Sequence, residues 1–192
     1  MKITKAQSQE NRGLIVETAS ALFRERGYDG IGVADLMSAA GFTHGGFYKH
    51  FGSKADLMAE ATEQGLAAKM NDYAGLSMAE FIERYLSREH RDDRADGCAM
   101  AALCGDAPRQ PPAVRETFAA GIAGMLAAVE RGAMAAGEAR DVARAKAIGM
   151  FAQLLGAVVL SRACPDDSPL ADEILEVCRQ QLQSALAPAV RA

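Results

Sequence analysis

A cluster of polar side chains between Gly32 and Phe51 (GVADLMSAAGFTHGGFYKHF) has the residue types that proteins use to contact nucleic acids. Hydroxyl, imidazole and amine groups occur close together there, along with a pair of glycines. Hydroxyl and amine groups bind phosphate oxygens, and polar side chains in a groove reach base edges. The segment therefore predicts DNA contact by Thr43, His44, Gly45, Tyr48, Lys49 and His50.

Two short helices joined by a glycine turn are expected to position these groups. Apolar residues repeat at three- and four-residue steps on one face of the first helix: Val33, Leu36, Met37 and Ala40. Gly41 supplies the left-handed residue that ends this helix, and Thr43 is the expected N-cap of the second. Phe47 and Phe51 are spaced to anchor the second helix against the domain core. This is the outline of a helix-turn-helix, whose second helix lies in the major groove.

Gly45 and Gly46 are unusual inside so short a helix. Glycine costs roughly 1 kcal/mol relative to alanine in a helix interior, so a pair of them calls for a reason. Close approach of the backbone to a duplex is one reason, and a loosened surface turn is the other.

A supporting helix is expected on each side of this segment. Before it, an apolar stripe over 7–26 predicts a helix that ends at Gly27. After it, Ser53 followed by Asp56 resembles a capping box, which starts the next helix at Ser53 and places Lys54 in its first turn. The helix dipole disfavours a lysine there. A nearby DNA phosphate would remove this conflict, and a solvated lysine is the alternative.

The stretch from about Leu14 to Leu57 resembles the N-terminal domain of the TetR family of bacterial one-component transcriptional repressors. The positions that carry the resemblance are Ala21, Phe23, Gly27, Gly41, Phe47, Tyr48, His50, Phe51 and Lys54. The resemblance implies that DNA is contacted by Thr43, His44, Gly45, Tyr48, His50 and Lys54. Gly32 stands where the family usually has a threonine or serine, and Ala34 where a polar or basic residue is common. Both departures remove potential DNA-backbone contacts, which puts the affinity in doubt.

Composition and charge fit a soluble protein with two parts. The chain has 192 residues, 49% of them hydrophobic, and a net charge of -4. Residues 1–54 carry seven Lys and Arg against five Asp and Glu, a net of +2, which leaves -6 for residues 55–192. A mildly basic head on an acidic body suits DNA contact by one end. We expect a helix-turn-helix DNA-binding domain over 1–54, continuing into the helix that starts near 53, and a ligand-binding and dimerisation domain over 55–192.

The rest of the chain predicts helices and no strand-like alternation. The expected fold class is therefore all-α, with an N-terminal three-helix head and a larger C-terminal helical domain. Pro112 suits the first turn of a long helix, because its missing N–H leaves no bond unmade there. The expected helices span about 53–73, 77–90, 98–105, 112–135, 140–164 and 169–186, with a polar loop over 90–97.

The last two helices are the expected dimer surface. The penultimate helix is apolar over much of its circumference, and Gly149 and Gly156 allow another helix to approach closely. Two such helices from each subunit can form a four-helix bundle, which is also how the TetR resemblance implies dimerisation. An ordinary intrachain core is the alternative. The expected interface residues are Phe151, Leu154, Leu155, Val158, Ile174, Cys178 and Leu182.

The middle helices offer apolar, adaptable walls for a small-molecule effector. The candidate lining residues are Tyr73, Phe81, Tyr85, Met100, Cys104, Phe118, Ile122 and Met125. A stripe of methionine and aromatic residues is also typical of plain core, so that alternative stays open. The resemblance implies that a ligand in this region sets the spacing of the DNA-binding heads and so releases the operator.

The four cysteines are expected to be thiols of a cytoplasmic protein. Residues 1–12 lack the apolar segment of a signal peptide, and no uninterrupted apolar run reaches the ~18 to 20 residues of a membrane span. Cys98 is expected at a helix N-terminus near Arg94, a setting that favours the thiolate and suits an oxidant or electrophile sensor. A buried, inert cysteine is the alternative.

Metal, cofactor and catalytic chemistry are not expected. Cys98 and Cys104 lack close-spaced partners, His90 stands alone, and no nucleophile elbow, P-loop or GxGxxG occurs. The sequence therefore predicts a TetR-like homodimer that binds a double-stranded DNA operator, as a repressor released by a small hydrophobic ligand. The competing class is a helical small-molecule or thiol-based redox sensor whose DNA binding is weakened.

Overall fold

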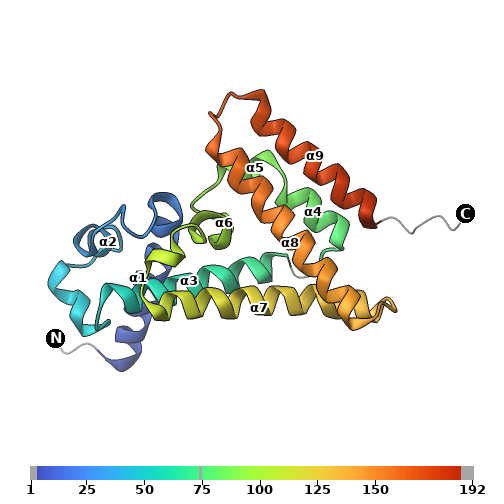
Figure 1. Ribbon diagram of the computed structural model, residues 1–192. Coiled ribbons are helices and arrows are strands. Elements are labelled where there is room, and N and C mark those ends of the chain that lie inside the picture. The colour runs from blue at the N-terminus through green and yellow to red at the C-terminus, as the bar shows by residue number, and fades with distance from the viewer. Residues whose placement is uncertain (1–3, 74, 187–192) are drawn as a thin grey trace, which may run out of the picture. The chain divides into compact units, whose positions relative to one another are not determined.

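The computed structural model describes residues 4–73 and 75–186, and every regular element in this part of the chain is a helix (Figure 1). The N-terminal elements are α1 (Lys5–Arg26), α2 (Val33–Ala39), the 3-10 helix η1 (His44–Lys49) and α3 (Lys54–Asp72). The middle elements are α4 (Met78–Tyr85), α5 (Arg88–Asp92), α6 (Ala99–Leu103) and the 3-10 helix η2 (Ala107–Arg109). Three long helices follow: α7 (Pro112–Ala135), α8 (Arg140–Ala163) and α9 (Pro169–Leu186). The predicted all-α class is confirmed.

Local sequence signals account for most of the helix ends. Gly27 follows α1 with φ 73° and Gly41 follows α2 with φ 83°, so both occupy the left-handed region that glycine tolerates best. The Ser53 hydroxyl accepts a hydrogen bond from the Asp56 amide at 3.2 Å and caps α3. α7 and α9 each begin with a proline, as expected for the first turn of a helix.

The helix expected over 77–90 is wrong, because the structure has two helices there, α4 and α5. Ser87 starts α5 by accepting a hydrogen bond from the His90 amide at 3.1 Å. His90 and Arg91 therefore lie in α5 and are buried, although the sequence placed them at or inside a polar loop. The apolar spacing continues across the break, so it could not reveal where the chain turns.

Arg91 is 1% exposed and closes the C-terminal end of α8. Its guanidinium donates to the carbonyl oxygens of Ser161 at 3.1 Å and Cys164 at 3.4 Å, and it pairs with Asp92 at 2.5 Å. Carbonyl groups in the last turn of a helix lack intrahelical donors, so a cation there satisfies them and opposes the helix dipole. Hydrogen bonds to backbone therefore tie the short α5 to α8.

The chain divides into two compact units. One holds the residues up to Lys69 together with Arg94–Gly121, and the other holds Met70–Asp93 together with the residues from Ile122 onward. The first unit is larger than the head expected over 1–54, because α6, η2 and the first part of α7 belong to it, and α6 contacts α1. Lys54 is the first residue of α3, and the first unit continues along this helix to Lys69.

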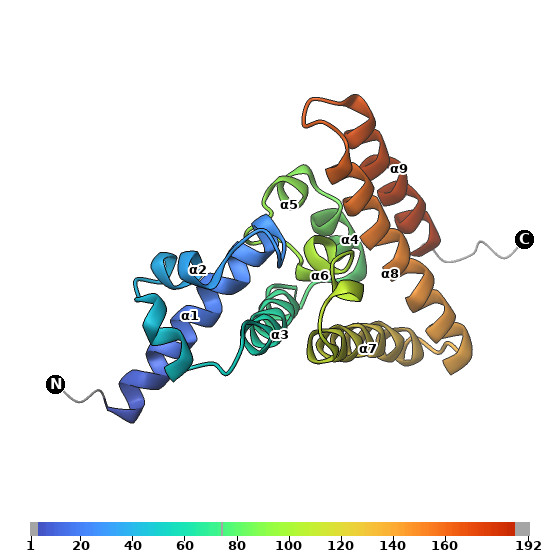
Figure 2. The ribbon, with the colours of Figure 1, turned by 60° about the vertical axis from the view of Figure 1, so that its left-hand side comes forward.

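The core of the first unit joins α1, α2, η1 and α3 (Figure 2). Its buried apolar residues include Ile15, Ala19, Phe23, Leu36, Met37, Phe47, Phe51 and Leu57. Tyr28, in the loop after α1, is fully buried, and its hydroxyl lies 2.5 Å from the Thr62 hydroxyl on α3. Burial raises the pKa of Tyr28 to about 12. The loop between α1 and α2 is thereby held against α3.

In the second unit, α8 and α9 lie side by side (Figures 1 and 2). The residues that they bury include Leu154, Val158, Ala171, Leu175 and Leu182. The Ser161 hydroxyl on α8 donates to the carbonyl oxygen of Ala171 at 2.8 Å, which satisfies a polar group inside this contact. The pair is therefore packed by apolar side chains along its length and hydrogen-bonded near the connecting turn.

Two helices, α7 and α8, are long and apolar enough to cross a membrane by length and composition alone. The sequence reading expected none, because it required an uninterrupted apolar run. An average over a window reaches the same hydropathy with a few polar residues included, such as Gln153 in α8. Long apolar helices are also common in soluble folds, so one or two of them are weak evidence for a membrane location.

Candidate nucleic-acid interface

The turn between α2 and η1 has the backbone of a helix-turn-helix. The Gly41 amide donates to the Ser38 carbonyl at 3.0 Å and the Phe42 amide donates to the Met37 carbonyl at 2.8 Å. These two bonds close the C-terminal end of α2 around the left-handed glycine. At its other end α2 begins after Gly32, which offers no side-chain cap. The backbone amides of the turn therefore have hydrogen-bond acceptors, whereas the start of α2 has no side-chain cap.

The second helix of the motif is the 3-10 helix η1, which is shorter and tighter than the helix that the sequence predicts. Thr43 occupies the N-cap position with an extended backbone, but its side chain makes no capping hydrogen bond, which corrects the expected N-cap. Two consecutive glycines and a missing cap both weaken an α-helix, which explains the difference. Phe47 and Phe51 are buried, with ring centroids 5.4 Å apart, so the predicted aromatic anchor is confirmed.

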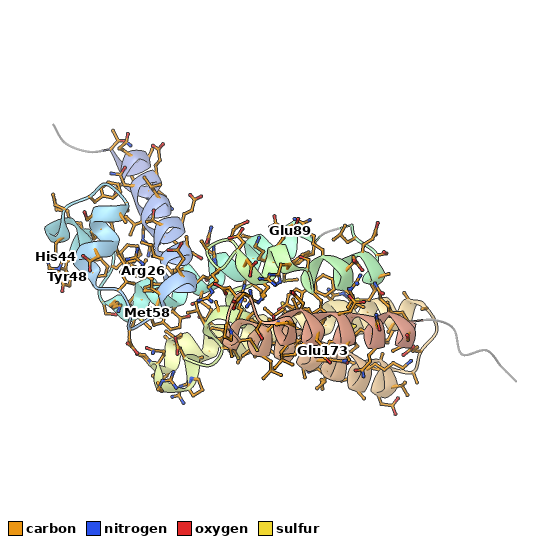
Figure 3. The ribbon with its side chains drawn as sticks, turned by 90° about the horizontal axis from the view of Figure 1, so that it is seen from above. Arg26, His44, Tyr48, Met58, Glu89 and Glu173 are labelled. Carbon is orange, nitrogen blue, oxygen red and sulfur yellow. The ribbon has the colours of Figure 1, made fainter. Side chains whose placement is uncertain are left out.

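The structure places most of the predicted DNA contacts on the outer side of η1. Thr43, His44, Gly45, Tyr48 and Lys49 are exposed. Tyr48 has 70% of its surface accessible, and Figure 3 shows it with His44 at the outer edge of the head. A tyrosine is rarely so exposed without a partner, because its ring is apolar. His50 differs from the others, since it is partly buried at the end of η1.

The two glycines of η1 are not required by packing inside the protein. A side chain at Gly45 would meet no atom within 4 Å. A side chain at Gly46 would meet Met37 Cε at 3.7 Å and Thr43 Oγ1 at 3.8 Å, which are ordinary contacts. Neither residue has a positive φ. Packing and backbone conformation therefore do not require glycine at either position, and only Gly45 leaves open space that an approaching duplex could occupy.

Lys54 is placed differently from the other predicted DNA contacts. Its ammonium group donates to the carbonyl oxygens of Tyr28 at 2.5 Å and Ile31 at 2.8 Å, and it lies 5.9 Å from the centroid of the Phe23 ring. The sequence predicts a DNA phosphate or water as the partner of this lysine, whereas in the structure its partners are backbone carbonyls. These bonds explain how a cation is tolerated in the first turn of α3.

Arg12 on α1 supports the site and was missed by the sequence reading. It forms a bidentate ion pair with Glu60 on α3, and its Nε donates to the His50 carbonyl oxygen at 3.3 Å. The Glu60 hydrogen bond raises the pKa of Arg12. Because its partner on α3 lies 48 positions along the chain, no local pattern could have revealed this role. Arg12 holds the end of η1 through the backbone of His50.

The second unit contains an apolar hollow of about 280 Å³. It is lined by Met70, Tyr73, Leu76, Met78, Phe81, Met125, Leu126, Ala128, Val129, Met150, Phe151 and Leu154. Three of the predicted effector contacts are in this set, namely Tyr73, Phe81 and Met125. Tyr73 and Phe81 meet edge to face, with centroids 4.9 Å apart and planes at 82°. The hollow is at the small end of the range for ligand pockets.

The other predicted effector contacts lie elsewhere. Tyr85 is buried behind Phe81, with ring centroids 5.4 Å apart, and Ile122 is partly buried on α7. The remaining three belong to the first compact unit: Met100, Cys104 and Phe118. The helical pattern alone could not assign apolar residues to one unit or the other, which is why the predicted set mixes them.

Three of the seven predicted dimer residues are buried inside the chain, and the other four are partly buried. Leu154, Val158 and Leu182 are buried in the subunit, and the partly buried members are Phe151, Leu155, Ile174 and Cys178. The large apolar residues that α8 and α9 expose are others: Val142, Ile148, Val159, Leu160, Leu170, Val177 and Leu186. The predicted dimer surface on α8 and α9 therefore stays a prediction, and burial in the single chain argues against Leu154, Val158 and Leu182 as its contacts.

Cys98 occupies the N-cap position of α6, as the sequence predicts. None of the four cysteines, all of which lie in the described part of the chain, is joined in a disulfide, and Cys98 is buried. Burial, and secondarily the neighbouring Cys98, raise the pKa of the Cys104 thiol, so Cys104 holds its proton more tightly than a free cysteine. Within residues 4–73 and 75–186, no group of three or more His, Cys, Asp or Glu side chains is arranged to hold a metal ion.

Two family models match the chain. Bacterial regulatory proteins of the tetR family match residues 15–61, and the C-terminal domain of LmrA/YxaF-like transcriptional regulators matches residues 76–174. An HTH-type transcriptional regulator of Mycobacterium tuberculosis is 28% identical over 191 residues, covering 93% of this chain and 95% of its own. The HTH-type transcriptional regulator TtgR of Pseudomonas putida is 42% identical over 55 residues, which cover 29% of this chain and 26% of TtgR.

Solved structures share this fold along nearly the whole chain. A TetR transcriptional regulator of Chloroflexus aurantiacus has a TM-score of 0.77 at 26% identity, covering 94% of this chain and 96% of that one. The reduced form of Escherichia coli NemR has a TM-score of 0.79 at 20% identity, covering 94% and 100%. The similarity therefore extends from the helix-turn-helix through α9.

Proposed function

Because the chain belongs to the TetR family of transcriptional regulators, we propose that it is a homodimeric repressor, that it binds a palindromic DNA operator, and that a small apolar molecule releases it. Operator binding rests on η1. The observation that carries this part is the outer surface of η1, where Tyr48 and Lys49 are exposed and the side-chain position of Gly45 is open. Exposed polar groups beside an unobstructed backbone suit base and phosphate contacts in the major groove.

Dimerisation is supported by the outward face of α8 and α9. Ile148, Val159, Leu170 and Val177 are each more than two-fifths exposed in the single chain. Single apolar residues on a surface are ordinary, but a row of them along two adjacent helices favours a partner helix. A two-fold pairing of these faces makes a four-helix bundle, and two recognition elements ~34 to 36 Å apart then read the two halves of a palindrome.

Effector control is supported by the hollow in the second unit. Its walls are methionine and aromatic side chains, which adapt to an apolar occupant. An occupant that binds more tightly to the conformation with unsuitable head spacing shifts the population away from DNA. We also propose a cytoplasmic location, where the DNA target is. Regulation by a thiol is less well supported, because Cys98, the candidate sensor, is buried.

A fluorescence-anisotropy titration of labelled palindromic promoter DNA at several salt concentrations tests the proposal. Specific binding in the nanomolar range with a steep salt dependence is expected. Tyr48→Ala and Lys49→Ala should each weaken this binding without unfolding the dimer, and Arg131→Gln, which removes an exposed charge on α7, should not. Weak binding that ignores sequence would contradict the operator proposal, and a monomer in sedimentation experiments would contradict the dimer.

A further inference from the structure

Arg84, an exposed residue on α4, contacts a residue that lines the apolar hollow of the second unit. Its guanidinium carbon is 5.6 Å from the centroid of the Tyr73 ring, and Tyr73 lines the hollow. Its Nη1 reaches the Asp72 carbonyl oxygen only at 3.5 Å, the limit of a hydrogen bond. Within residues 4–73 and 75–186, no carboxylate pairs with this arginine. A cation with free donors therefore lies beside the ring of a lining residue.

The acidic side chains nearest to Arg84 on the same helix are already engaged. The Glu83 carboxylate accepts hydrogen bonds from Arg179 and from Gln183, and the Arg179 bond lowers its pKa. The Glu80 carboxylate accepts from the hydroxyl and the amide of Ser77, and these bonds lower its pKa. Both groups stay charged and bound to their own partners. The donors of Arg84 remain available for an anion from outside the protein.

The hollow itself contributes no charge. Its lining is apolar apart from the hydroxyl of Tyr73, and the edge-to-face pair of Tyr73 and Phe81 offers a wall that suits a flat ring. A volume of about 280 Å³ restricts the occupant to a small body. A charged group could not enter these walls without losing its hydration, so the charge of a ligand must stay at the mouth.

We propose that the effector is a small aromatic carboxylic acid, whose rings fill the hollow and whose carboxylate is bound by Arg84. This inference rests on the proposed effector role of the hollow and names the chemical class that the hollow selects. A planar guanidinium binds a carboxylate with two parallel N–H···O bonds, which a lysine cannot reproduce. The carboxylate of the ligand then provides selectivity for acids, and burial of its rings provides affinity.

Calorimetric titration of the full chain with three probes of one shape tests the inference: 2-naphthoate, 2-naphthamide and 2-naphthylmethylammonium. The naphthoate should bind most tightly, and Arg84→Gln should weaken it about tenfold while leaving the amide within twofold. Arg84→Lys should recover only part of the loss. The matched control is Arg131→Gln, which removes an exposed positive charge from α7 of the same unit and should change nothing.

Filling the hollow separates this inference from the proposed function. Ala128→Phe should abolish binding of all three probes, and Leu76→Phe serves if the first variant does not fold. The hollow is not the effector site if none of the probes binds the wild-type chain, or if binding survives both filled variants. Either result would contradict the proposed effector control through the hollow. If all three bind equally, or the ammonium binds best, the hollow remains the site but the inference about Arg84 is overturned.

Discussion

The guanidinium of Arg12 lies 4.6 Å from the centroid of the Phe51 ring, and the same side chain donates to the carbonyl of His50. Phe51 packs with Phe47, the buried anchor of η1. The orientation of the recognition element therefore depends on a cation from α1 that faces its last residues. We therefore expect Arg12 to affect DNA binding by positioning η1 rather than by its charge, which Glu60 neutralises.

Replacing Arg12 should weaken operator binding through geometry rather than charge. Arg12→Gln and Arg12→Lys should each lower operator affinity about five- to tenfold. Both substitutions lose the planar guanidinium, which stacks on Phe51 and forms a bidentate ion pair with Glu60. Unfolding free energy should fall by at most about 1 kcal/mol, as for other partly exposed ion pairs. Anisotropy titration and urea unfolding measure the two effects. Full affinity in Arg12→Lys would show that the charge alone matters.

Alanine at Gly45 should have opposite effects on folding and on DNA binding. Its side chain has open space and its φ is negative, so Gly45→Ala should stabilise the chain by about 0.5 to 1 kcal/mol. The same methyl group would stand where the duplex backbone or a base edge approaches, so operator affinity should fall at least tenfold. Gly46→Ala is the matched control, because that position faces Met37 and should gain stability with little loss of affinity. A loss of stability at both positions would contradict the open geometry.

Lys54 can be assigned to folding or to DNA by the salt dependence of binding. Lys54→Met removes the donor shared by the Tyr28 and Ile31 carbonyls, so it should lower the unfolding free energy by about 1 to 3 kcal/mol. If the lysine serves only these carbonyls, the slope of log K against log salt should not change. A slope reduced by about one would instead identify a phosphate contact. Lys49→Ala, on the exposed surface, provides the reference for that reduction.

A serine at Gly32 should strengthen the start of α2. The residue has φ -85° and ψ 162°, the extended backbone of an N-cap, and a Cβ there would meet Asp35 Oδ2 at an ordinary 3.5 Å. Gly32→Ser should therefore stabilise the chain by a few tenths to about 1 kcal/mol, or roughly 1 to 4 °C in Tm. Operator affinity should rise as well if the hydroxyl reaches a phosphate. Calorimetry and anisotropy report these separately, and a lower Tm would show that glycine is needed here.

Sequence alone predicted the features that local signals govern. Glycines at 27 and 41, prolines at 112 and 169, and apolar spacing were enough for the helix-turn-helix and the three long helices. Each of these signals acts within one or two turns of chain. The fold class follows from them without knowledge of tertiary contacts.

Features that depend on distant partners were not predicted. The donors of Lys54 are bound by carbonyls 23 and 26 positions away, and Arg12 depends on a glutamate 48 positions away. The break before Ser87 leaves no mark on the apolar spacing. For α8, both faces are apolar, so only packing could separate Leu154 inside from Ile148 outside. In each case the sequence does not reveal which distant residues pack against a given side chain or helix face.

The hydrogen bonds between Arg91 and the last turn of α8 make the formation of α5 depend on α8. A five-residue helix such as α5 has no stability of its own, and the acceptors that hold it lie about 70 positions further along the chain, at Ser161 and Cys164. We therefore expect α5 to form only after α8 has been synthesised. A chain that stops short of residue 161 should lose α5 as well as the end of α8, although the two are far apart in sequence.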